Sequence, residues 1–200
     1  MSFKRLFAVA ILAVMTVGVS AQDFKKFRFG PTVGLNVATT TSAEVSSRVG
    51  FQVGALGEYN FNDNFFLLSA VKFSQKGGKF AGGGGSFNPY YIEIPLHGGY
   101  RYNFNDKFSL FGEFGPYIGI GVCGKISEDG EPSINYFGNE GMEALGAKAK
   151  RFDFGLGLAA GAEYSNFQLR LGYDFGLTKL YDVVGSAKNR NFYIALSYMF

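Results

Sequence analysis

The chain has 200 residues, enough for one domain with a substantial interior, and a formal net charge of +3. Its charges form no block of one sign, which excludes electrostatic support for a nucleic-acid partner, and its one cysteine, Cys123, excludes an internal disulfide and a cysteine metal cluster. Glycine (29 residues) and aromatic residues (23 Phe and 12 Tyr) are in excess, and the strand face on which each kind falls discriminates between the possible folds.

The first 21 residues predict an export signal. Lys4 and Arg5 give the positive start, residues 6–19 form a short apolar run, and residues 19–21 (Val-Ser-Ala) form a small-residue cleavage site. Cleavage after Ala21 takes the mature chain out of the cytoplasm and leaves residues 22–26 as a short periplasmic lead. No later run of ~18 apolar residues could form a membrane helix, so a membrane location requires strands.

Short Asn/Asp turns divide the rest of the chain. The heptapeptide at 59–65 (Tyr-Asn-Phe-Asn-Asp-Asn-Phe) recurs almost unchanged at 102–108, and a reduced version lies at 164–167. Four longer connections, near 38–49, 77–89, 123–151 and 181–189, alternate with these three turns. The pattern predicts eight strands, near 27–37, 50–61, 65–76, 90–104, 108–122, 152–164, 167–178 and 190–200.

Each predicted strand has one bulky apolar face and one face that carries charge and glycine. In 167–178, for example, Leu169 and Leu171 alternate with Arg170, Gly172 and Asp174. Glycine falls mainly on the charged face, at 30, 34, 54, 99, 115, 119, 121, 155, 157, 161, 172 and 176, and on the apolar face at 57, 98 and 112. A water-exposed face has no need of missing side chains, whereas a narrow lumen does. We therefore expect an all-β fold, an eight-stranded antiparallel up-and-down transmembrane β-barrel over residues 27–200.

Three prolines inside the predicted strands conflict with a closed ladder. Pro31, Pro95 and Pro116 lack the N–H that a neighbouring strand needs, and a closed barrel has no free edge. We expect a β-bulge at each of them.

The inward faces predict a polar network that fills the lumen. A bore of eight strands is too narrow for free water, which favours paired charges over a selective pore. The expected members are Arg28, Glu58, Lys72, Glu93, His97, Arg101, Glu113, Asp153, Glu163, Arg170 and Asp174.

The sequence offers only weak candidates for a catalytic or ligand-binding site. Glu93 and Glu113 could suggest acid–base catalysis but lie mid-barrel, and His97 lies mid-strand rather than at the outer rim, where a lipid-modifying enzyme would need it. The glycine run 82–85 lacks the Lys-Ser/Thr of a phosphate loop. We expect no catalytic, cofactor-binding or metal-binding residues.

The connection at 123–151 is the longest and mixes charges with exposed apolar candidates. Its apolar residues are Tyr136, Phe137, Met142 and Leu145, so it is the segment we expect to contact a protein partner, the alternative being a solvated loop.

Two stretches resemble known families. The last strand alternates Phe192, Ile194, Leu196, Tyr198 and Phe200, and resembles the closing strand of Gram-negative outer-membrane barrels, in which a terminal Phe is part of the signal read by the assembly machinery. Residues 90–96 (Tyr-Tyr-Ile-Glu-Ile-Pro-Leu), after a glycine-rich loop and a strand that ends with residues 72–77 (Lys-Phe-Ser-Gln-Lys-Gly), resemble the PorT-like family of Bacteroidetes outer-membrane barrels. This resemblance implies an outer-membrane barrel. The founding member works in type IX protein secretion, and the family offers no catalytic residues.

The combined expectation is a monomeric, non-enzymatic outer-membrane barrel surrounded by lipid and lipopolysaccharide, with both termini in the periplasm. Its favoured role is structural or surface-interacting, as in OmpA/OmpX-type barrels. The alternatives are an accessory subunit of a secretion or barrel-assembly complex, a lipid-modifying enzyme, and a secreted soluble calycin with an apolar cavity.

Overall fold

The computed structural model describes residues 26–81, 84–128, 130–139, 143, 146, 148–182 and 187–200. The predicted export signal (1–21), all but the last residue of the predicted lead, two loop glycines (82 and 83) and Met142 and Leu145 lie outside this part of the chain.

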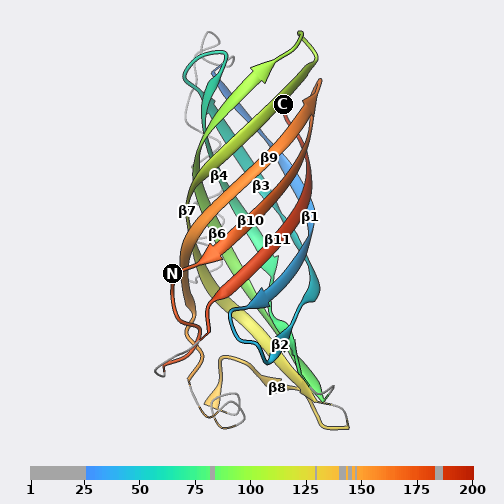
Figure 1. Cartoon of the computed structure of the whole chain (residues 1–200), viewed down its shortest axis with the longest axis vertical. Coiled ribbons are helices and arrows are strands. Elements are labelled where there is room, and N and C mark those ends of the chain that lie inside the picture. The colour runs from blue at the N-terminus through green and yellow to red at the C-terminus, as the bar shows by residue number, and fades with distance from the viewer. Residues whose placement is uncertain are drawn as a thin grey trace, which may run out of the picture.

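Eight long strands form a closed antiparallel ring (Figure 1). They are β1 (Phe27–Thr40), β3 (Arg48–Asn60), β4 (Phe65–Gln75), β6 (Gly85–Asn103), β7 (Phe108–Glu128), β9 (Phe152–Tyr164), β10 (Phe167–Gly176) and β11 (Asn189–Tyr198). Each strand pairs with the next long strand in the sequence, and β1 pairs with β11 to close the ring. The predicted eight-stranded up-and-down barrel is confirmed.

The closing seam between β1 and β11 brings two backbones unusually close. Pairing runs from Thr32 opposite Ser197 to Thr40 opposite Asn189, and the N–H of Phe200 donates to the carbonyl of Phe29 at 2.9 Å. A Cβ at Gly30 would lie 1.6 Å from the carbonyl oxygen of Tyr198. Only a glycine permits this approach.

The three short turns gather at one end of the barrel, which we call the short-turn end (Figure 1, top). In the first turn, the Asn62 side-chain oxygen accepts from the N–H groups of Asn64 (2.9 Å) and Phe65 (2.8 Å). Asn105 makes the same two bonds to Lys107 and Phe108. The repeated heptapeptide therefore encodes a repeated Asx turn.

The two faces of the ring are inverted relative to a water-soluble barrel. Leu171 and Ile194 are exposed on the outside, while Arg101 and Arg170 are buried inside. In a soluble calycin the apolar residues would fill the interior, so that alternative is wrong. Among the described residues, no helix has the length and apolarity to cross a bilayer.

The predicted bulges at the three prolines are not present, and this prediction was wrong. The register runs in phase past Pro31, Pro95 and Pro116. The ladder instead omits two consecutive pairings on one side of Pro95 (Ala70 opposite Pro95 and Val71 opposite Ile94), omits two likewise beside Pro116, and then resumes. A missing N–H is thus accommodated without an extra residue. The register shift in the β6–β7 pair falls at Tyr90/Tyr91, and beyond it Cys123 is exposed.

The opposite end, the long-loop end, carries a folded extension rather than simple loops (Figure 1, bottom). The β6–β7 hairpin continues past the ring, β5 (Gly78–Phe80) pairs with β6, β2 (Val45–Ser46) pairs with β5, and β8 (Ile134–Asn135) pairs with β7. A hydrophobic cluster of Phe87, Ile126, Tyr136 and Ala149, with partly buried neighbours from all four long connections, lies beside these strands. We call this cluster the loop core. The predicted loop at 77–89 is thus partly strand.

Candidate functional site: the charged lumen and the long-loop end

The residues predicted for the polar network all lie on the inner side of the ring. Nine are buried: Glu58, Glu93, His97, Arg101, Glu113, Asp153, Glu163, Arg170 and Asp174. The other two, Arg28 and Lys72, are half-buried. The ion pairs divide these side chains into two clusters, one nearer each end of the barrel.

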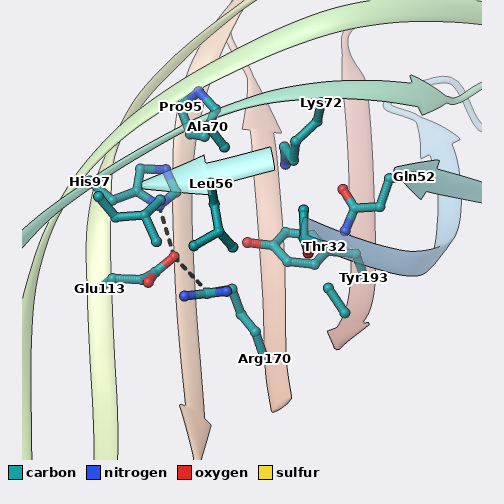
Figure 2. A pocket seen from close by; sticks show the side chains of 12 residues that line it. Thr32, Gln52, Leu56, Ala70, Lys72, Pro95, His97, Glu113, Arg170 and Tyr193 are labelled. Carbon is teal, nitrogen blue, oxygen red and sulfur yellow. Dashed lines mark hydrogen bonds and ion pairs between the residues drawn. The ribbon is translucent and has the colours of Figure 1, made fainter. Parts of the chain in front are cut away.

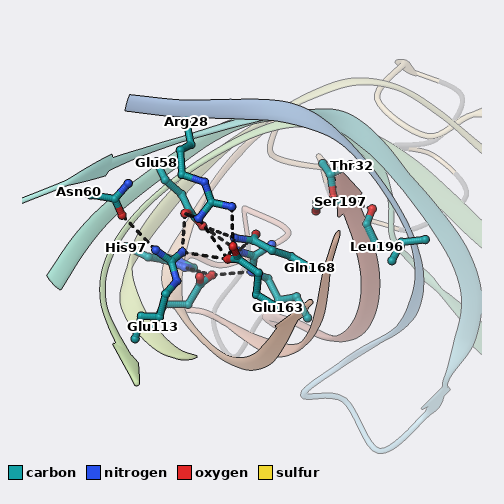
Figure 3. A network of polar contacts seen from close by, with 12 residues as sticks. Arg28, Thr32, Glu58, Asn60, His97, Glu113, Glu163, Gln168, Leu196 and Ser197 are labelled. Atoms are coloured by element: carbon teal, nitrogen blue, oxygen red, sulfur yellow. Dashed lines mark hydrogen bonds and ion pairs between the residues drawn. The ribbon is translucent and has the colours of Figure 1, made fainter. Parts of the chain in front are cut away.

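The first cluster lies toward the short-turn end and joins three arginines to three glutamates (Figure 3). Glu58 accepts from Arg101 at 2.6 Å and from Gln168 at 2.9 Å. Arg28 binds Glu163 through both terminal nitrogens, at 2.7 and 3.2 Å. These charge-assisted bonds satisfy groups that β1, β3, β6, β9 and β10 aim at the same point, because each residue lies on the inward parity of its strand.

His97 belongs to the same cluster. Its Nδ1 lies 3.2 Å from Glu113 Oε1, and that oxygen also lies 3.2 Å from the Nε of Arg170 (Figure 2). The guanidinium groups of Arg101 and Arg170 stack on the rings of Phe66 and Phe111, at 4.8 and 5.0 Å. Aromatic faces thus occupy the space beside the ions.

A small cavity between the clusters shows how full the lumen is. Its volume is about 20 Å³, and its lining includes Thr32, Lys72, Pro95, His97 and Tyr193 (Figure 2). A space of this size holds about one water molecule. At this level, the barrel interior is a packed core rather than a channel.

The second cluster lies toward the long-loop end and contains a lysine that the sequence analysis missed. Lys76 is buried, pairs with Glu93 and with Asp153 (3.4 Å to the latter), and lies over the ring of Tyr117 at 4.7 Å. Lys72 lies 3.9 Å from Glu93. Lys76 directly follows β4 and shares its even-numbered inward parity. That parity was sufficient to predict it, because 76 is the last residue of the predicted strand 65–76, but the expected network did not include it.

Uncharged side chains complete the second cluster. Asp153 accepts from Asn189 (2.9 Å) and Thr178 (3.0 Å), and Asp174 accepts from Asn191 (3.2 Å). Asn36 donates to the carbonyls of Phe51 and Gln75 and to Ser74. The expected network contained only charged residues and His97, so it did not include the amides of Asn189 and Asn191 that donate to these carboxylates.

No reactive constellation emerges from these contacts. Glu93 is engaged by Lys76, and Glu113 by His97 and Arg170. Within the described ranges, no group of three His, Cys, Asp or Glu side chains has the arrangement of a metal site.

The aromatic residues of the longest connection pack onto the protein itself, contrary to the expectation that they contact a partner. Tyr136 is 1% exposed, and its ring stacks on Phe87 with centroids 5.6 Å apart. Its hydroxyl donates to Tyr181 at 3.2 Å, and burial raises the pKa of the Tyr136 phenol well above its usual range. Phe137 packs edge-on against Tyr91 at 6.2 Å. The two remaining candidates, Met142 and Leu145, lie outside the described residues.

The apolar side chains of the last strand face outward. Ile194 and Leu196 are exposed, as are Phe192, Tyr198 and Phe200. The Phe200 ring lies 5.6 Å from that of Phe29 and 5.1 Å from that of Tyr198, so aromatic residues of the first and last strands form one band at the seam.

An antiparallel ring of eight strands with an apolar exterior and a charged, packed interior defines a small integral outer-membrane β-barrel. The chain belongs to the family described as outer membrane protein beta-barrel domain, whose model matches residues 20–182.

Solved structures of other outer-membrane proteins are similar to this chain at low identity. Neisserial surface protein A (NspA) is 18% identical over 86% of this chain and 97% of that one, with a TM-score of 0.50. Ail, the attachment invasion locus protein of Yersinia pestis, is 17% identical over 88% of this chain and 99% of that one, with a TM-score of 0.48. OprG from Pseudomonas aeruginosa is 14% identical over 87% and 95%, with a TM-score of 0.45. No curated protein matches the chain.

Proposed function

We propose that this outer-membrane protein is a non-catalytic surface-interaction barrel. Its transmembrane ring is filled by side chains and holds a folded extension outside the cell. We call this extension, which consists of β2, β5, β8 and the loop core, the platform. The observation that carries the proposal is the loop core, because four separate connections converge on one packed cluster above a filled lumen. A pore would need an open interior, and an enzyme would need reactive side chains within reach of a substrate.

The platform is built to keep its shape. Strands β2, β5 and β8 extend the sheet beyond the ring, and Phe87 and Tyr136 stack nearly parallel, with 10° between their planes. Preorganised surfaces bind with a smaller entropic cost than mobile loops. A rigid outer surface therefore favours recognition over a purely structural role.

The orientation of the platform can be tested by labelling with an impermeant reagent. Cys123 is first replaced by serine, because it is exposed and is the sequence's single cysteine. One variant then carries Ser133→Cys on the platform, and a matched variant carries Asn105→Cys in a short turn. On intact cells we expect a membrane-impermeant maleimide to label the first variant and not the second. The reverse pattern would refute the proposal.

The lumen claim has a separate test. We expect the purified protein to give no stable ion conductance in planar bilayers, because the cavity between the charge clusters accommodates about one water molecule. A steady, ion-selective conductance would show that the lumen opens.

The accessory-subunit alternative rests on the resemblance to the PorT-like family alone. Residues 90–96, which carry that resemblance, lie in β6, where Tyr91, Glu93 and Pro95 point into the lumen. Side chains at these positions pack inside the barrel, so the motif they form gives no specific reason for a role in secretion. Recovery of stoichiometric secretion components with the solubilised protein would favour the alternative.

Three further expectations belong to the same proposal. Cleavage follows Ala21, which mass spectrometry of the mature protein would check. The exposed apolar belt contacts lipid and lipopolysaccharide around a monomer, which native mass spectrometry would test. The assembly machinery reads the outward-facing apolar side chains of the last strand, which are Phe192, Ile194, Leu196, Tyr198 and Phe200.

A further inference from the structure

A second, much larger cavity opens at the long-loop end. Its volume is about 320 Å³, and it lies between the connection after β1, the β5–β6 segment and the connection after β10. Three of its lining residues are aromatic and four, from residues 40–44, are polar, and we call these two groups the aromatic side and the polar side. We call the cavity the platform pocket.

The aromatic side consists of Phe80, Phe87 and Tyr181. The rings of Phe80 and Phe87 lie 5.6 Å apart and are tilted by 36°. Tyr136 supports this side from behind, since it stacks on Phe87 and donates to the hydroxyl of Tyr181. The loop core therefore fixes the aromatic surface before any ligand arrives.

The polar side is supplied by consecutive residues after β1. Thr40 Oγ1 accepts from the N–H of Ser42 (3.2 Å), Ser42 Oγ from the N–H of Glu44 (3.3 Å), and Thr41 Oγ1 from the N–H of Lys188 (3.0 Å). Each of these oxygens accepts a backbone bond through one lone pair, which leaves the hydroxyl proton available for donation elsewhere. Glu44 also lines the pocket, is exposed, and adds a carboxylate acceptor.

We propose that the platform pocket binds a ring of a neutral saccharide. A sugar ring has an apolar C–H face, which suits Phe80 and Tyr181, and an edge of hydroxyl groups, which suits the donors of residues 40–42 and the acceptor Glu44. The carboxylate disfavours an anionic ligand, and the hydroxyl groups disfavour a lipid tail. The volume lies at the small end of the usual range for ligand pockets, as a short saccharide requires.

The inference rests on the proposed function, since the pocket reaches extracellular saccharides only if the platform faces outward. The two are separable by experiment. If purified protein binds no sugar while the Ser133→Cys variant is still labelled on cells, the pocket is rejected and the surface role stands. If the platform is not labelled on cells, the proposed function fails regardless of sugar binding.

The test is saturation-transfer NMR on the full barrel in a zwitterionic detergent without a sugar headgroup. Glucose, galactose, mannose and N-acetylglucosamine are each added at about 20 mM, well above the ~1 mM Kd of a weak single-ring site. We expect at least one of them to receive saturation, mainly at the C–H protons of one ring face. Absence of transfer to all four sugars overturns the proposal.

A double variant, Thr41→Val with Glu44→Gln, controls for nonspecific contact. It removes a donor and a charged acceptor while leaving the aromatic side intact, so the affinity should fall about tenfold or more. The matched control is Glu131→Gln, an exposed carboxylate that does not line the pocket, and it should bind as the parent does. Equal transfer in the double variant and the parent would also overturn the proposal.

Discussion

Replacement of Glu58 by glutamine should destabilise the barrel more than a substitution at a water-exposed residue. Glu58 is fully buried, and three guanidinium groups approach its oxygens: Arg101 at 2.6 Å, and Arg28 and Arg170 at 3.7 Å. Glutamine keeps the shape and removes the charge, which leaves three arginines facing two glutamates in the first cluster. Breaking a buried ion pair on one side costs about 3–5 kcal/mol, because the remaining charge has lost its counterion away from water.

The assay is urea unfolding in lipid vesicles, followed by circular dichroism because the chain has no tryptophan. With a denaturant slope of ~2 kcal/mol per molar, the expected loss moves the midpoint down by about 1.5–2.5 M. Glu131→Gln, an exposed control, should move it by less than ~0.3 M, which corresponds to the usual range of ±0.5 kcal/mol for surface changes.

A compensating variant makes the argument sharper. Glu58→Gln combined with Arg101→Met returns the first cluster to two arginines and two glutamates, so the double variant should regain part of the loss. If Glu58→Gln behaves like Glu131→Gln, the arginines do not depend on Glu58, and the lumen is not the paired network that the contacts indicate. If the loss of stability in the double variant equals the sum of the losses in Glu58→Gln and Arg101→Met alone, the two residues are uncoupled, and the paired network is again contradicted.

Four other substitutions test the seam, the outer face, the last residue and the loop core. Gly30→Ala should abolish the heat-modifiable band on gels, because its Cβ would collide with a strand backbone, whereas Gly98→Ala, which meets nothing within 4 Å, should preserve it; a normal band for Gly30→Ala would contradict the seam geometry. Leu171→Arg should cost about 2–4 kcal/mol in vesicles, and a neutral result would mean that this face does not contact lipid. Phe200→Ala should lower the amount of barrel in the outer membrane yet refold normally when purified, and equal amounts in cells would argue against a role in assembly. Because burial raises the pKa of Tyr136, its contribution to stability is complete below about pH 10, the unfolded value, and is lost as the pH rises through the folded value. The difference in phenolate absorbance between the parent and Tyr136→Phe should therefore develop at a higher pH than the titration of exposed tyrosines. A difference that develops at the same pH as theirs would contradict the buried position.

The barrel was predictable because a strand allows only two orientations for each side chain. Once Leu171 and Arg170 are assigned to opposite faces, the register carries the assignment along the whole strand, and any slip would exchange lipid for lumen. The position of glycine then distinguished the faces: a Cβ at Gly99 would lie 2.1 Å from the ring of Phe66, whereas one at Gly98 would meet open space. Because a narrow lumen has little room for side chains, glycine is concentrated at inward-facing positions of the sequence.

The long-loop end was not predictable in the same way. Strands β2, β5 and β8 have only two or three residues each, too few to show a period. Tyr136 was expected to be an exposed contact residue because its burial depends on Phe87, which comes from a different connection of the chain. The prediction at the prolines failed for a different reason: the absence of one N–H was taken to require an extra residue, although the ladder can omit two pairings and remain in register.

The loop core has a consequence for how this protein should respond to heat and denaturant. Its packed residues come from connections outside the ring, while the two ionic clusters hold the ring together from within. Water surrounds the first assembly and hydrocarbon the second, so the two are stabilised by different solvents. The molecule should therefore melt in two stages, with the platform losing its shape while the membrane-embedded ring remains closed.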